Sequence, residues 1–103
     1  MTSPPRGISR EAWDHLTLFQ QEVYRATRTI PMGETRSYQW VAERIGRPRA
    51  ARAVGQALHH NPFAPMVPCH RVVRSDGTLG GYAGGLAKKR KLLRREGWRS
   101  PGR

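Results

Sequence analysis

The chain has little of what several protein classes need. It holds one cysteine, Cys69, among 103 residues, which excludes an internal disulfide and a cysteine-based zinc cluster. Its longest uninterrupted apolar run is three residues, at positions 40–42, whereas a signal-peptide core needs about 7 to 15 apolar residues and a membrane span about 20. We therefore expect a soluble protein without a membrane partner, cytoplasmic in the cell and nucleoid-associated in a bacterium.

Acidic residues are also few. The chain has 7 Asp and Glu against 19 Lys and Arg, a formal net charge of +12, and this excess on so small a body produces a strongly positive surface. We expect an acidic partner, and nucleic acid is the leading candidate. The length fits one domain that buries roughly 60 to 65% of its unfolded surface, which excludes a large multi-domain enzyme. We expect it to act as a monomer.

Composition and periodicity divide the chain into a folded body at 12–98 and flexible termini at 1–11 and 99–103. An apolar stripe at three- and four-residue spacings predicts a helix over 18–29, which Thr17 and Gln20 would cap. Ser37 is a candidate N-cap for a short helix over 38–45, and Gly46 marks its end.

Pro48 fits the first position of a further helix, over 49–60. Its inner face would be small and apolar, with Ala51, Val54, Gly55 and Leu58, and its outer face polar and cationic, with Arg49, Arg52 and Gln56. Together with the preceding helix it makes a helix-turn-helix, and small neighbours such as Ala53 would let it approach a nucleic-acid groove closely. The alternative is a solvated surface helix.

The second half of the body is more irregular. Pro65 and Pro68 favour an extended path into a short β-segment over 71–73, and Asp76 with Gly77 predicts a turn. The glycine-rich loop at 80–85 could approach a ligand without Cβ obstruction. A helix over 86–96, closed by Gly97, would direct three leucines to the core: Leu86, Leu92 and Leu93. Its cations favour a solvated face, with weak phosphate contact as the alternative: Lys88, Lys89, Arg90, Lys91, Arg94 and Arg95. The expected fold class is mainly α with a short β-segment.

A lone cysteine followed by histidine has the ingredients of an activated nucleophile, because a thiolate attacks and a nearby His lowers the thiol pKa. The alternative is a cysteine that packs as a small hydrophobe. Cys69 and His70 can share a proton only if the backbone turns there or a water bridges them. A metal held by His59, His60, Cys69 and His70 would match none of the standard zinc spacings, so we expect neither metal nor cofactor.

The segments Pro68-Cys69-His70-Arg71-Val72 and Gly80 to Gly85 resemble the active-site signature of the O6-alkylguanine-DNA alkyltransferases, or methylated-DNA-protein-cysteine methyltransferases. The resemblance continues upstream through Pro31, Gly33, Ser37, Tyr38, the run Ala50 to Gly55, Asn61 and Pro62. It covers about 19–97, and it is similar only to the C-terminal, DNA-binding and catalytic half of that family.

The resemblance implies a winged-helix-like domain that takes an alkyl group once from O6-alkylguanine in double-stranded DNA. Cys69 would be the nucleophile, His70 its base through a bridging water, and Glu96 the acid that orients His70. Asn61 would brace the adjacent turn, and Tyr82 would donate a proton or hydrogen bond to the departing guanine. The remaining pocket would be formed by Leu58, Val72, Ala83 and Gly84.

The resemblance also implies base flipping, since a thiolate cannot reach a base inside the duplex. Arg52 would fill the vacated stack and Tyr38 would rotate the neighbouring phosphate. The helix with Ala53 and Gly55 would lie in the minor groove, and Arg49 and Gln56 would contact the same DNA.

Two departures keep an alternative open. Ala83 stands where many members have a serine that helps to hold O6. Short relatives, the alkyltransferase-like proteins, often replace the cysteine and only bind lesions, which they flag for nucleotide excision repair. Because this chain keeps Cys69, we expect transfer, with a lesion-binding partner of excision repair as the alternative.

Overall fold

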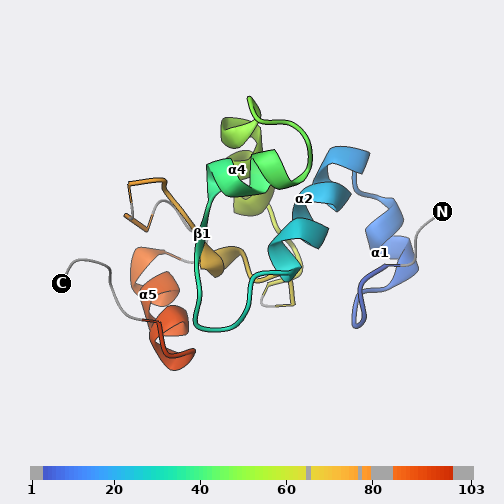
Figure 1. Ribbon diagram of the computed structural model, residues 1–103. Coiled ribbons are helices and arrows are strands. Elements are labelled where there is room, and N and C mark those ends of the chain that lie inside the picture. The colour runs from blue at the N-terminus through green and yellow to red at the C-terminus, as the bar shows by residue number, and fades with distance from the viewer. Residues whose placement is uncertain (1–3, 65, 77, 80–84, 99–103) are drawn as a thin grey trace.

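The computed structural model describes residues 4–64, 66–76, 78–79 and 85–98 (Figure 1). In chain order its elements are α1 (Arg10–Asp14), α2 (Leu18–Arg28), β1 (Arg36–Ser37), α3 (Tyr38–Arg44), α4 (Ala51–His59), the 3-10 helix η1 (Cys69–Arg71), β2 (Val72–Val73) and α5 (Leu86–Arg95). The prediction of a mainly helical domain with a short β-segment is confirmed. None of the helices in these residues is long and apolar enough to cross a membrane.

The packed part of the chain begins before residue 12. Ser9 caps α1 by accepting a hydrogen bond from the backbone N–H of Ala12 at 3.1 Å. Trp13 is 1% exposed and Ile8 is 7% exposed, both within the core. The sequence analysis did not predict helix α1, because its five residues are too few to show a helical periodicity.

The helix-capping signals predicted α2 and α3 to within a residue. Thr17 and Gln20 form the expected capping box, with Gln20 N–H donating to Thr17 Oγ1 at 3.1 Å and Thr17 N–H donating to Gln20 Oε1 at 2.8 Å. Ser37 caps α3 through the backbone N–H of Trp40 at 2.9 Å. Gly46, with φ of 77°, follows the last turn of α3 as expected.

Helix α4 starts later than predicted. The expected start at Pro48 is wrong, because Pro48 and Arg49 lie in the turn that precedes the helix, and this turn is closed by a hydrogen bond from Ala50 N–H to Arg47 O at 2.9 Å. Gln39 on α3 reaches this turn and donates to Pro48 O at 2.7 Å. The two helices and the turn between them make the predicted helix-turn-helix.

The two short strands join distant parts of the chain. Strand β1 pairs with β2 in parallel, with Arg36 opposite Val72 and Ser37 opposite Val73. The predicted strand over 71–73 is wrong at its first residue, because Arg71 ends the 3-10 turn η1 and only Val72 and Val73 are extended. The pairing brings the start of α3 beside the segment that carries Cys69.

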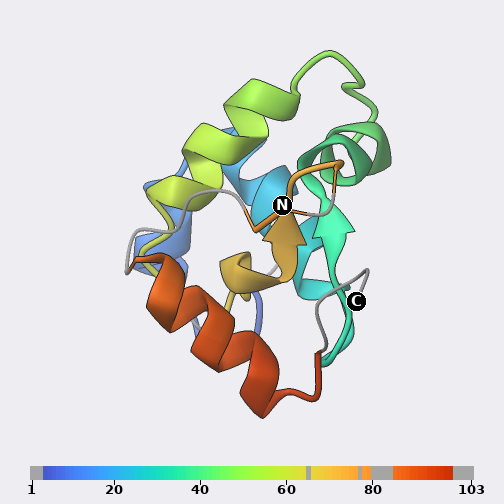
Figure 2. The ribbon, with the colours of Figure 1, turned by 90° about the vertical axis from the view of Figure 1, so that its left-hand side faces the viewer.

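The core lies where α2, α3 and α4 meet the η1–β2 segment, around the fully buried side chains of Val23, Val41, Val54, Val67 and Val72. Figure 2 shows η1 and β2 in the middle of the molecule, with α4 on one side and α5 on the other.

Helix α5 ends one residue earlier than predicted, with Glu96 as its C-cap and Gly97 at φ of 90°. Two expectations for its faces are wrong. Leu86 is 50% exposed and so lies outside the core, whereas Lys89, expected on the solvated face, is 0% exposed. The cause is position: Lys89 and Leu93 are four residues apart and therefore lie on one side of α5, the side that is buried in the domain.

Candidate active site and nucleic-acid surface

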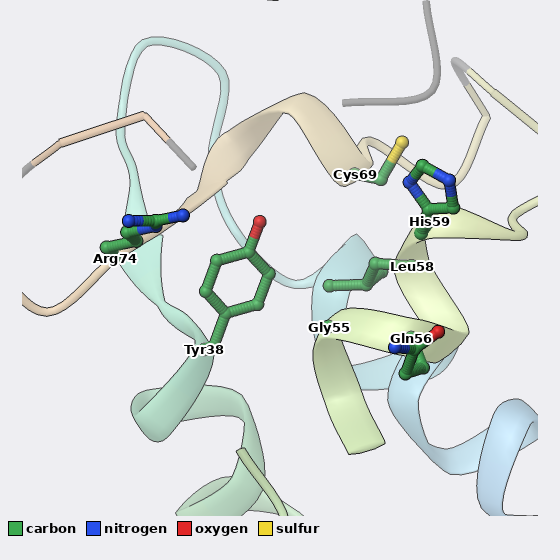
Figure 3. Close-up of a pocket in the computed structure, with 7 residues that line it drawn as sticks. All are labelled: Tyr38, Gly55, Gln56, Leu58, His59, Cys69 and Arg74. Atoms are coloured by element: carbon green, nitrogen blue, oxygen red, sulfur yellow. The ribbon is translucent and has the colours of Figure 1, made fainter. Parts of the chain in front are cut away.

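Cys69 lines a cavity of about 410 Å³ between α3, α4 and η1 (Figure 3). The same cavity is lined by Tyr38, Gly55, Gln56, Leu58, His59 and Arg74. Figure 3 shows the Cys69 thiol and the Tyr38 hydroxyl on opposite sides, with the Leu58 side chain between them. The Cys69 residue is 8% exposed, so the cavity gives a small substrate its route to the thiol.

A tight turn sends the side chains of Cys69 and His70 to different places. Cys69 N–H donates to Val67 O at 2.8 Å, and Arg71 N–H donates to Pro68 O at 2.9 Å. The preceding chain is held by Asn61, which donates from Nδ2 to Val67 O at 2.8 Å and accepts from Phe63 N–H at 2.9 Å. The backbone therefore turns at Cys69. A turn here is one of the two conditions under which Cys69 and His70 could share a proton.

Behind the cysteine, His70 contacts a carboxylate. Its Nε2 lies 2.9 Å from Glu96 Oε2, and the His70 side chain is 1% exposed. Burial lowers the pKa of His70, and this outweighs the opposing effect of the Glu96 hydrogen bond. The ring is therefore neutral at pH 7, and we assign its proton to Nε2, where it is donated to Glu96.

That assignment leaves Nδ1 of His70 as an acceptor. Nδ1 is buried, and it has no hydrogen-bond partner within the described part of the chain. An unpartnered buried acceptor is costly, and one at a reactive site needs an explanation. Here the unpartnered acceptor belongs to the residue that follows the cavity cysteine in the chain.

Arg71 fixes the carboxylate in place. Its Nε donates to Glu96 Oε1 at 2.9 Å and its Nη2 donates to Oε2 at 2.7 Å, while Nη1 donates to Ile30 O at 2.8 Å. Burial would raise the pKa of Glu96, but the hydrogen bonds from Arg71 and His70 outweigh it and hold the pKa below its usual value. Glu96 is thus an anion with a two-point anchor.

Gly33 allows the loop before β1 to close on this cluster. It has φ of 88°, and a Cβ at this position would lie 2.8 Å from the backbone oxygen of Glu96. Any other residue would push the end of α5 away or strain the loop.

A buried lysine lies on the other side of η1 from α4. Lys89 Nζ donates to Val72 O at 2.8 Å and also to Leu79 O. It lies 5.9 Å from the centre of the Tyr38 ring. Burial lowers the pKa of Lys89 to about 8. The sequence signal was its spacing of four residues from Leu93, which is also buried.

The expected DNA-binding residues lie beside the cavity on α4 and in the turn before it. Arg49, Arg52, Ala53 and Gln56 are exposed. A second hollow, of about 460 Å³, includes Arg52 and shares Tyr38, Gly55 and Arg74 with the cavity of Cys69. The exposed arginine and the buried thiol therefore border two neighbouring hollows with three lining residues in common.

The structure brings together most of the predicted site and adds to it. Cys69, Leu58, Tyr38, Gly55 and Gln56 share one cavity, while Val72 contacts Lys89 behind it. Tyr82, Ala83 and Gly84 lie outside the described residues. Four residues that the structure places at the site were not predicted to be part of it: His59, Arg71, Arg74 and Lys89. Within the described residues, no three or more His, Cys, Asp or Glu side chains gather as a metal site would require.

Comparison with known proteins identifies the domain. Residues 18–98 match the family described as 6-O-methylguanine DNA methyltransferase, DNA binding domain. The chain is 58% identical over 85 residues to a methylated-DNA--protein-cysteine methyltransferase of Mycobacterium bovis, covering 82% of this chain and 52% of that protein. It thus spans about half the length of this curated relative.

Solved structures agree. The Mycobacterium tuberculosis OGT in complex with DNA is 57% identical, with a TM-score of 0.78 over 80% of this chain and 51% of that one. Schizosaccharomyces pombe Atl1, in complex with damaged DNA containing O6-carboxymethylguanine, is 32% identical, with a TM-score of 0.69 over 87% of this chain and 80% of that one. With the family match extending over most of its folded body, the chain belongs to the 6-O-methylguanine DNA methyltransferase family through its DNA-binding domain.

Proposed function

We propose that this protein repairs O6-alkylguanine in double-stranded DNA by transferring the alkyl group to Cys69, once per molecule and as a monomer. The observation that carries the proposal is the thiol of Cys69 in a cavity, followed in the chain by His70, whose carboxylate partner Glu96 is anchored by Arg71. The family of the chain and the methyltransferase names of its relatives support the same activity.

In the proposed reaction, the thiol proton of Cys69 passes to His70 Nδ1 through a bridging water. The thiolate attacks the alkyl carbon, so that the S–C bond forms while the bond from carbon to guanine O6 breaks. The electron pair of the broken bond stays on the guanine, which takes up a proton and remains in the DNA as an unmodified base. Glu96 would stabilise the His70 cation that forms transiently, as the acid of a catalytic triad does.

The other expected residues would hold the flipped base. Leu58 lines the cavity, and the carbonyls of Cys69 and Val72 would read the guanine amino group. Asn61 would keep the turn before Cys69 in shape through its two hydrogen bonds. Tyr82, Ala83 and Gly84 keep the roles that the family resemblance gives them: Tyr82 would donate to the leaving guanine, and the backbone around Ala83 and Gly84 would hold O6.

On the DNA side, Arg52 would enter the stack in place of the flipped base and Tyr38 would rotate the neighbouring phosphate. The exposed Arg49, Ala53 and Gln56 and the half-buried Gly55 would contact the minor groove along α4. The hollow lined by Arg52 shares Tyr38, Gly55 and Arg74 with the cavity of Cys69, and this supports these separate roles for Arg52 and Cys69.

A stoichiometric repair assay tests the proposal. Duplex DNA with one O6-methylguanine is given in excess, and the number of lesions lost per protein molecule is counted. We expect a plateau at one lesion per molecule, and none for Cys69→Ala, which should still bind the duplex. Tight lesion binding without any loss of lesions from wild-type protein would contradict transfer, and would support a lesion-binding protein that passes the site to nucleotide excision repair.

A further inference from the structure

Helix α5 carries a dense group of exposed cations that the proposed reaction does not use. The five members are Lys88, Arg90, Lys91, Arg94 and Arg95, all exposed. No ion pair joins any of them to an acidic group within the described residues, and the nearest acid in sequence, Glu96, is already bound by Arg71 and His70. We name these five residues the α5 cationic face.

This arrangement works against the stability of the helix. Arg90 and Arg94 are four residues apart, as are Lys91 and Arg95, and like charges at this spacing destabilise a helix by about 0.2 to 0.5 kcal/mol per pair. The helix dipole favours cations in the last turn, which accounts for Arg94 and Arg95. It does not account for Lys88 in the first turn, where a positive charge is unfavourable. Fold stability therefore does not explain Lys88, Arg90 and Lys91.

The face also has the shape of a contact surface. Ala87, Arg90, Lys91, Arg94 and Arg95 line a shallow hollow of about 540 Å³. The opposite side of α5 is fixed to the body of the domain, since Lys89 and Leu93 are 0% exposed and α5 lies against η1. The cations are thus carried by an anchored helix.

Its place in the fold separates it from the surface assigned to DNA above. Figure 2 shows α4 and α5 on different sides of η1. The hollow lined by Arg52 and the hollow on α5 share no residue. The α5 cationic face is therefore a second positive surface on the same small domain.

We propose that the α5 cationic face binds phosphates of the DNA backbone as a second contact, independent of α4. The ten residues of α5 span about 15 Å at 1.5 Å per residue. With α5 parallel to the duplex axis, this length equals the axial rise of about four phosphates of one strand, at 3.4 Å of axis each. The contact rests on the proposed function in one respect, that DNA is the ligand. The phosphates belong either to the flank of the duplex held by α4 or to a second duplex.

The test compares two triple variants with the same change in net charge. Arg90→Gln/Arg94→Gln/Arg95→Gln removes three cations from the α5 cationic face, and Arg6→Gln/Arg10→Gln/Arg28→Gln removes three from the N-terminal half. Both are made in a Cys69→Ala background, and binding to an undamaged duplex of about two helical turns is measured over a range of salt. Because no lesion or transfer is involved, the result does not depend on whether Cys69 accepts an alkyl group.

We expect the α5 variant to weaken the salt dependence. The negative slope of log affinity against log salt should become shallower by up to about 2.7, which is about 0.9 for each of three phosphates. The N-terminal variant should change the slope much less. A third variant, Arg90→Lys/Arg94→Lys/Arg95→Lys, keeps the charge and should keep the slope. Equal slopes for the two Gln variants would overturn the proposal, and would leave the face to solubility or to an acidic protein.

A titration with duplex of about one helical turn then identifies the source of the phosphates. Two short duplexes per Cys69→Ala protein, and one per α5 variant, would assign the face to a second duplex. One short duplex per protein in both cases, with the α5 effect present only on the longer duplex, would assign it to the flank of the duplex that α4 binds.

Discussion

The buried lysine gives a quantitative prediction for stability against pH. Lys89 is 0% exposed, and burial lowers its pKa from 10.5 to about 8. Below pH 8 the lysine is protonated in both the folded and the unfolded chain, so it adds no pH dependence. Between pH 8 and 10.5 the unfolded chain still holds the proton while the folded chain has lost it. Stability therefore rises with pH in this window.

The size of the rise follows from the same values. Integrating the difference in bound protons from pH 7 to pH 9.5 gives an increase in the free energy of unfolding of about 2 kcal/mol from Lys89 alone. The neutral amine keeps two N–H groups, enough for the carbonyls of Val72 and Leu79, so these hydrogen bonds survive the loss of the proton. Burial raises the pKa of Tyr24 to about 12, which makes stability fall above about pH 10. The measurement should therefore stop at pH 9.5.

The assay is urea unfolding followed by helical circular dichroism at pH 7, 8, 9 and 9.5. Wild-type Lys89 and Lys89→Met are compared, both in a Cys69→Ala background so that the thiol does not titrate. The stability difference between the two proteins should shift in favour of Lys89 by about 2 kcal/mol from pH 7 to pH 9.5. A difference that stays constant, or that shifts in favour of methionine, would refute the buried, proton-losing lysine.

Three further predictions concern the reaction and the DNA. Glu96→Gln keeps the shape but places an amide NH2 against N–H donors of Arg71 or His70, so methyl transfer should slow by about 100-fold or more while DNA binding changes little; equal losses in both would make Glu96 purely structural. Arg52→Ala should weaken lesion-specific binding and transfer from duplex by about tenfold or more, because flipping costs a few kcal/mol. Reaction with free O6-benzylguanine needs no flipping and should be unaffected. An equal loss of reaction with the free base would mean that Arg52 supports the pocket. Log affinities for damaged and undamaged duplex should fall as parallel lines against log salt, since pocket contacts release few counterions; a flat line for undamaged duplex would remove α4 as the DNA-binding element.

Local signals predicted the parts of the fold that depend on neighbouring residues. Thr17 and Ser37 start their helices by accepting from backbone N–H groups three residues on, and Gly46 and Gly97 end theirs at positive φ. The start of α4 was wrong because a proline is equally acceptable in a turn and at a first helical position, and Pro48 is in the turn.

Such local signals could not predict the contacts between residues far apart in the sequence. Arg71 and Glu96 are 25 residues apart, and no local pattern shows that an arginine beside the histidine would fix its carboxylate. Lys89 was assigned to the surface by residue type, although its spacing of four residues from Leu93 indicated the core. The pairing of Cys69, His70 and Glu96 was proposed from family resemblance, and the fold brings His70 and Glu96 within hydrogen-bond distance.

Alkyl transfer to Cys69 is tested most directly by the mass of the intact protein after incubation with duplex containing O6-methylguanine. We expect every active molecule to gain the mass of one methyl group, located by peptide mapping on Cys69, and Cys69→Ala to gain none. An unchanged mass after long incubation with excess duplex, or a methyl group on another residue, would contradict Cys69 as the acceptor.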